Sequence, residues 1–75
     1  METTTWKEVT GNVYRLIIDG TQQGTLYSNP DDAMTDTFLI FPQADFSDWK
    51  SKEGIEYSWM DIIIGSEVVG QIQEV

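Results

Sequence analysis

The most regular pattern of hydrophobic and polar residues in the chain spans residues 57–74. Two runs rich in β-branched and aromatic residues meet there at Gly65 and Ser66. Glycine followed by a small polar residue is typical of a two-residue turn, so the pattern predicts a β-hairpin, and the turn fixes which residues pair. The predicted pairs are Ile64 with Glu67 and Ile62 with Val69. Because this stretch holds the densest apolar sequence in the chain, we expect the rest of the fold to pack around it.

The first third of the chain predicts two more strands and a second hairpin. Residues 6–9 alternate large and charged side chains, which indicates a short edge strand. Residues 13–18 have the period of two expected of a strand, with Leu16 in the middle of one face. Glycines within residues 19–24 favour a turn, and residues 25–27 then resume an extended pattern.

The middle of the chain predicts two short helical pieces around one strand. Residues 28–32 combine a capping side chain, a proline and two acids, which predicts a brief helical turn to about Met34. Residues 37–41 are apolar on both faces, which fits a central strand that ends before the next proline. Residues 45–54 predict a helix of one or two turns, with an aspartate to cap it and a glycine to end it.

Together these elements predict a mainly β fold with minor α structure. We expect five or six strands and one or two short helical turns, arranged as a single small antiparallel sheet or a partly closed barrel. A chain of 75 residues forms one domain, so residues 1–75 are treated as a single acidic, mainly β unit. Its aromatic and apolar content is that of a folded domain rather than a disordered segment.

Composition then excludes several kinds of chemistry. The chain has no cysteine and no histidine, which excludes disulfides, zinc sites of the Cys/His kind and a histidine general base. The serines and threonines therefore lack a histidine to activate them, and we expect neither an enzyme nor a cofactor. No signal-peptide pattern and no apolar run of about 20 residues is present, so a cytoplasmic location is the expectation.

The charge distribution changes the expected partner. Thirteen acidic residues against four basic ones give a net charge of −9, and no base lies between Arg15 and Lys50. A surface with this much negative charge repels phosphate backbones and anionic lipid headgroups. We therefore expect no direct binding to nucleic acid or membrane. A basic protein is the natural complement, although net negative charge also serves solubility alone.

The candidate partner-binding residues lie in the middle of the chain. They are Asp31, Asp32, Asp36, Asp45, Asp48 and Trp49. The first three have the chemistry of a calcium site but not the EF-hand spacing, so we interpret them as acids of a helix start and expect no metal. The next two are interpreted as helix caps rather than an acid–base pair. The tryptophan is either a lid on the core or an anchor for a partner, whereas Trp59 is expected inside the core.

The resulting hypothesis is a non-catalytic acidic protein-binding module. It would engage the basic surface of a nucleic-acid-binding protein, as an inhibitor of the nucleic-acid-mimic type. The alternative is a small structural or self-assembling subunit, a homodimer for example, that pairs through exposed strand edges.

Overall fold

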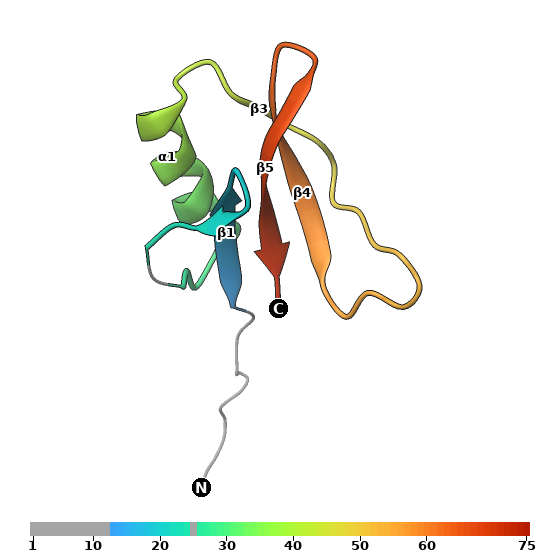
Figure 1. Ribbon diagram of the computed structural model, residues 1–75. Coiled ribbons are helices and arrows are strands. Elements are labelled where there is room, and N and C mark those ends of the chain that lie inside the picture. The colour runs from blue at the N-terminus through green and yellow to red at the C-terminus, as the bar shows by residue number, and fades with distance from the viewer. Residues whose placement is uncertain (1–12, 25) are drawn as a thin grey trace, which may run out of the picture.

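The structure is a computed structural model, and it describes residues 13–24 and 26–75. Its elements in chain order are β1 (Tyr14–Ile18), β2 (Thr21–Gln22), α1 (Pro30–Ile40), β3 (Asp45–Phe46), β4 (Ser58–Ile64) and β5 (Glu67–Glu74). The five strands form one antiparallel sheet in the order β2-β1-β5-β4-β3, with α1 against β1 and β5 (Figure 1). The mainly β prediction is confirmed, and of its two forms the open sheet is the observed one. The strand predicted at residues 6–9 lies outside the described residues.

The predicted β4–β5 hairpin is confirmed, together with its turn. Gly65 has a φ of 64°, which is the value that a type II′ turn requires at its first central position. Ile64 pairs with Glu67 across this turn, as the sequence predicts. The turn type and the residue pair next to it are therefore both as predicted.

The second predicted pair of this hairpin is wrong by one residue. Ile62 pairs with Gly70 rather than with Val69, because a β-bulge inserts one extra residue into β5. A Cβ atom at position 70 would lie 2.2 Å from the carbonyl oxygen of Ile17 on the neighbouring β1. The predicted register would have put Val69 opposite Ile62, where β5 lies closest to the backbone of Ile17. The bulge places Gly70 there instead.

The predicted first hairpin is also present, with a tighter turn than expected. Asp19 and Gly20 have φ values of 52° and 79°, which is the pattern of a type I′ turn, and they connect Ile18 directly to Thr21. An isolated bridge between Tyr14 and Tyr27 then continues the pairing along β1. Strand β2 itself is only two residues long.

The largest correction concerns α1. Its start is as predicted: the side chain of Asn29 accepts a hydrogen bond from Asp32 N–H at 2.9 Å, and Pro30 opens the first turn. The helix does not end near Met34 but runs for 11 residues, so the strand predicted at residues 37–41 is wrong. No helix-breaking residue occurs before Pro42, and a run that is apolar on both faces does not by itself distinguish strand from helix.

The helix predicted at residues 45–54 is also wrong. Asp45 and Phe46 form the edge strand β3, and the segment bridges β4 again where Lys50 pairs with Trp59. A helix this short has little stability of its own, so pairing with the adjacent β4 prevails.

The core lies between the sheet and α1. Leu16, Ile72 and Met60 occupy one row across β1, β5 and β4, and the first two are fully buried. The helix covers this face with Ala33 and Thr37, and the Thr37 hydroxyl donates to the Ala33 carbonyl at 2.8 Å. Trp59 is half-buried on the opposite face of the sheet, so its expected place in the core is a wrong prediction.

Candidate protein-binding site

The first three predicted partner-binding residues belong to the first two turns of α1. Asp31 and Asp32 lie in the first turn, where carboxylates interact favourably with the helix dipole, and Asn29 Nδ2 donates to Asp32 Oδ2 at 3.1 Å. Asp36 accepts a hydrogen bond from the hydroxyl of Tyr27 at 2.7 Å. Partial burial of this tyrosine, the hydrogen bond and the charges of Asp36 and Asp32 raise the pKa of Tyr27 to about 12. These acids thus have structural partners as well as charge.

The other three predicted residues lie along the β3 edge. Asp45 and Asp48 are exposed, and Trp49 is 40% exposed with its ring centroid 6.0 Å from that of Tyr14. Lys50, which follows, is paired through its Nζ with Asp61 Oδ2 at 2.5 Å. The six predicted residues therefore come from two separate elements rather than forming one cluster.

Two classes of site find no support in the part of the chain that the structure describes. Across residues 13–24 and 26–75, no group of three or more acidic side chains is placed to hold a metal ion. Within the same residues, no helix is both long enough and apolar enough to cross a membrane.

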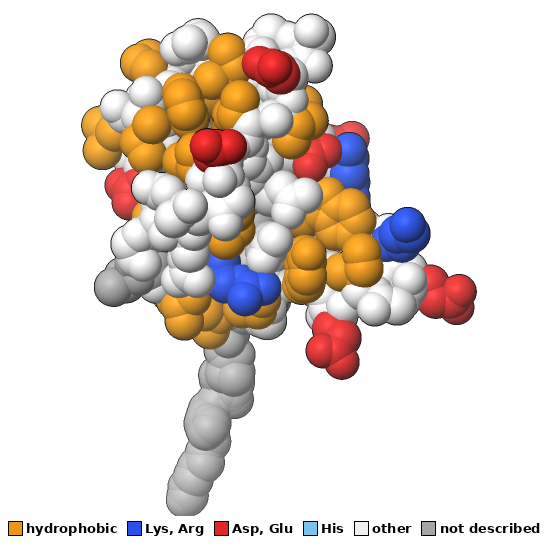
Figure 2. Space-filling model, in the orientation of Figure 1, with side chains coloured by type: hydrophobic (Ala, Val, Ile, Leu, Met, Phe, Trp, Pro, Cys, Tyr) orange, Lys and Arg blue, Asp and Glu red, His pale blue; other side chains and the backbone are white. Residues whose placement is uncertain are grey.

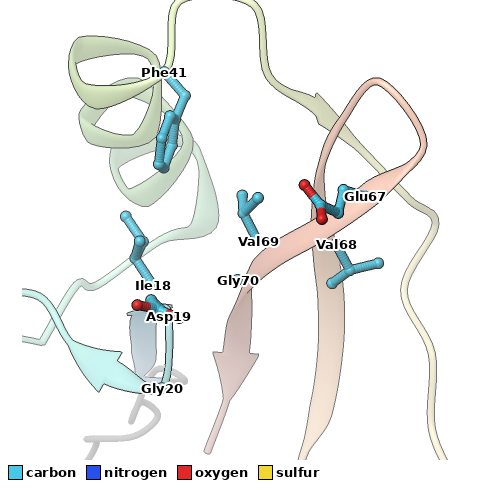
Figure 3. A pocket seen from close by; sticks show the side chains of 8 residues that line it. All are labelled: Ile18, Asp19, Gly20, Phe41, Glu67, Val68, Val69 and Gly70. Carbon is cyan, nitrogen blue, oxygen red and sulfur yellow. The ribbon is translucent and has the colours of Figure 1, made fainter.

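A pocket of about 620 Å³ lies between the β1–β2 turn, the start of β5 and the residue that follows α1. We call it the turn pocket; it is lined by residues 18–20, by Phe41 and by residues 67–70. Figure 3 shows Ile18 and Phe41 pointing toward one another across it, with Val69 facing them from β5. These three side chains give the pocket an apolar interior, and they come from three different elements.

The rim of the turn pocket is negatively charged. Asp19 lies on one side, in the β1–β2 turn, and Glu67 lies on the other, at the start of β5. Neither lysine nor arginine is among the lining residues. Phe41 caps the C-terminal end of α1, the negative end of the helix dipole, and no basic residue occupies the last helical turn. The pocket therefore combines an apolar interior with an electrostatic attraction for cations.

Exposed hydrophobic side chains extend from the pocket over the end of α1. Leu39 is 78% exposed, and Phe38 and Ile40 are 43% and 47% exposed. Figure 2 shows hydrophobic side chains gathered over this end of the molecule, with acidic groups among them. Single exposed apolar residues are ordinary, but several in succession on one helix end indicate an interaction surface.

The opposite face of the sheet is better covered by its own side chains. The guanidinium carbon of Arg15 lies 5.7 Å from the ring centroid of Tyr57, which packs edge-to-face on Trp59 at 6.2 Å. Gln73, between Arg15 and Trp59 in the pairing, is only 9% exposed. Around Gln73 this face is therefore closed by local packing.

Sequence reasoning missed the residues of the turn pocket. Asp19 was interpreted only as a turn residue, and Phe41 as part of a strand. The two turn signals, Asp-Gly and Gly-Ser, are visible in the sequence, but nothing in it shows that they lie at the same end of the sheet. That proximity depends on β1 pairing with β5, across more than 50 intervening residues.

No protein-family model, no curated protein and no solved structure matches the chain.

Proposed function

We propose that this chain is a non-catalytic module that binds a basic protein partner. The observation that carries the proposal is the turn pocket, which holds the apolar side chains of Ile18, Phe41 and Val69 and is rimmed by Asp19 and Glu67. Apolar contacts supply affinity in such a site, whereas surrounding charge selects the partner and accelerates its approach. The net charge of −9 of the whole chain adds to the attraction of a cation.

A nucleic-acid-binding protein is the class of partner that this charge favours. Such proteins carry basic surfaces complementary to phosphates, and an acidic module that covers such a surface acts as an inhibitor. The carboxylates at residues 31, 32 and 36 and at residues 45 and 48 supply negative charge outside the turn pocket. A cytoplasmic location, where such a partner would be met, stays a prediction from the sequence.

Capture at stepped salt concentrations tests this proposal. The full chain is immobilised, a lysate of the organism that encodes it is passed over, and bound proteins are eluted between about 50 mM and 1 M salt. The control bait carries Asn in place of Asp19, Asp31, Asp32, Asp45 and Asp48 and Gln in place of Glu67, because these amides lose the charge and Asn keeps a capping oxygen. We expect basic proteins that elute at intermediate salt and are depleted on the control bait. Capture of equal amounts by both baits, or of proteins without basic surfaces, contradicts the proposal.

Self-assembly is the second candidate, favoured by the exposed Phe38, Leu39 and Ile40. The last turn of α1 carries no charge, so two copies meeting there would bury apolar surface without opposing carboxylates directly. Light scattering coupled to size-exclusion chromatography separates the two candidates, since a free binding module elutes as a monomer. A dimer that dissociates on Leu39→Ser would favour self-assembly instead.

A further inference from the structure

The first three residues of β5 have no strand beside them on the side of β1. Pairing of β1 with β5 extends only from Gly70 to Glu74, because the chain turns away into β2 at residues 19–20. Within the described residues, residues 67–69 therefore form a short strand edge that is open on this side except at Val69, whose carbonyl accepts a hydrogen bond from Asp19 N–H. This edge is one wall of the turn pocket.

Val68 directs its backbone toward that pocket. Ile64 and Glu67 flank a two-residue turn and exchange hydrogen bonds, so the next pair, Ile63 with Val68, is a non-hydrogen-bonded pair. The N–H and C=O of Val68 accordingly point away from β4, toward the side of β1. The neighbouring Val69 carbonyl points to the same side, where it accepts a hydrogen bond from Asp19 N–H at 2.9 Å.

The side chains around this edge define what would pair with it. Figure 3 shows the side chain of Val68 turned away from the pocket, so Val68 offers its backbone there, whereas Ile18, Phe41 and Val69 offer apolar surface. From these positions we infer that the turn pocket binds an extended, lysine- or arginine-containing segment of a partner protein, which adds a short strand beside Val68. This inference rests on the proposed function and specifies how the basic partner is held.

Each part of such a segment has a counterpart in the pocket. One backbone N–H and one C=O of the segment pair with Val68, as in strand addition to an exposed sheet edge. An apolar side chain adjacent to that residue enters among Ile18, Phe41 and Val69, while flanking cations lie near Asp19 and Glu67. A second copy of this chain is a poorer occupant, because its net charge of −9 opposes entry past the acidic rim.

A capped heptapeptide with leucine at its centre and lysine at the other positions is the probe. We expect it to bind the full chain at low salt, as measured by isothermal titration calorimetry. The matched peptide with glutamate in place of lysine should not bind, and alanine in place of leucine should weaken binding. Failure of the lysine peptide to bind at low salt overturns the inference, whereas the proposed function is decided separately by capture from lysate.

Two charge variants with the same change in net charge locate the site. Asp19→Asn with Glu67→Gln removes the rim, and Asn tolerates the positive φ of position 19. Glu53→Gln with Glu56→Gln removes two exposed acids that lie outside the pocket and outside the predicted partner-binding residues. We expect roughly tenfold weaker peptide binding for the first pair and less than twofold for the second. Equal weakening by both pairs would mean non-specific attraction, which overturns the pocket as the site, while capture from lysate separately decides whether the chain binds a basic partner.

N-methylation of the peptide tests strand addition itself. Each of its three central backbone nitrogens is methylated in turn, since a strand beside Val68 donates through one of them only. Loss of that hydrogen bond should weaken binding about fivefold at one position and leave its neighbours unaffected. Uniform tolerance of all three changes overturns strand addition. Thermal unfolding of both charge variants is measured as a control. An unchanged melting temperature shows that any loss of binding is not caused by loss of the fold.

Discussion

The β4–β5 hairpin and the C-terminal half of α1 are both rich in hydrophobic residues, but they use them differently. The hairpin places Ile62 and Ile72 inside, both fully buried, on one face of the sheet. The helix end leaves Leu39 78% exposed, and the residues on either side of it are more than 40% exposed. One region therefore contributes its apolar residues to the core, whereas the other presents them at the surface.

This difference identifies the part of the molecule that folding alone does not explain. A strand sequence whose pattern, turn and burial all agree is satisfied by its own fold. At the helix end Phe38 packs edge-to-face on Phe46, with ring centroids 5.3 Å apart, but Leu39 remains largely in water, which is expected where it serves binding. The turn pocket lies where these two regions meet, since Phe41 and Val69 both line it.

The largest expected effect is the loss of a buried hairpin side chain. Ile72→Ala removes a fully buried side chain and should reduce the free energy of unfolding by about 2 to 5 kcal/mol. That is most of the stability of so small a domain, so the variant should be largely unfolded in urea-free buffer by circular dichroism. Leu39→Ala, the matched change at the helix end, should cost less than about 0.5 kcal/mol. Similar losses in the two variants would remove the distinction between the two regions.

A smaller effect is expected where β1 crosses the bulge. Gly70→Ala should lower the free energy of unfolding by about 1 to 3 kcal/mol, because the new Cβ would meet the backbone of Ile17 at 2.2 Å. Gly20→Asn is the control: open space surrounds that position and asparagine tolerates its positive φ, so urea denaturation should show a smaller loss. If Gly70→Ala is neutral, the close approach of β1 to β5 is not what sets the bulge.

The helix start should have a moderate effect. Asn29→Ala removes the acceptor of Asp32 N–H and should cost about 1 kcal/mol, measured by thermal unfolding. Asn29→Ser retains a capping oxygen and should recover most of that loss. An Asn29→Ala variant as stable as the parent would show that packing against the sheet, rather than the start signal, determines that residues 37–40 are helical.

The smallest effect is an alkaline one at the contact between Tyr27 and α1. With its pKa raised from 10.0 to about 12 by burial and by Asp36, Tyr27 keeps its proton in the folded chain after the unfolded chain has lost it. Its contribution to stability is therefore complete below pH 10 and is lost as the pH rises toward 12. Tyr27→Phe should show a shallower fall in melting temperature between pH 10 and 12. If the melting temperatures of the parent and of Tyr27→Phe fall in parallel over this pH range, Tyr27 does not cause the alkaline loss of stability.

Sequence patterns predicted those parts of the fold that depend on local signals. The turn at Gly65, the alternation around Leu16 and the cap at Asn29 each act within a few residues, and all three are observed. Residues 37–41 were misassigned because an apolar run fits a buried strand as well as a helix, and only the upstream helix start distinguishes the two.

The candidate site was less predictable than the fold. Acidic residues are visible in any sequence, so the prediction selected the densest clusters, at residues 31–36 and 45–48. The turn pocket instead joins Asp19 to Glu67 through long-range strand pairing, and its apolar interior depends on where α1 ends. A three-element pocket of this kind has no local signature in the sequence.

Amide chemical-shift mapping tests the central claim most directly. The ¹⁵N-labelled chain is titrated with the lysine peptide that has a central leucine, and shift changes are followed residue by residue. The account predicts the largest changes at residues 18–20, at Phe41 and at residues 67–70, with Val68 N–H moving downfield as it gains a hydrogen bond. Changes centred instead on the first turns of α1 or on the β3 edge would contradict the claim that the turn pocket holds the basic partner.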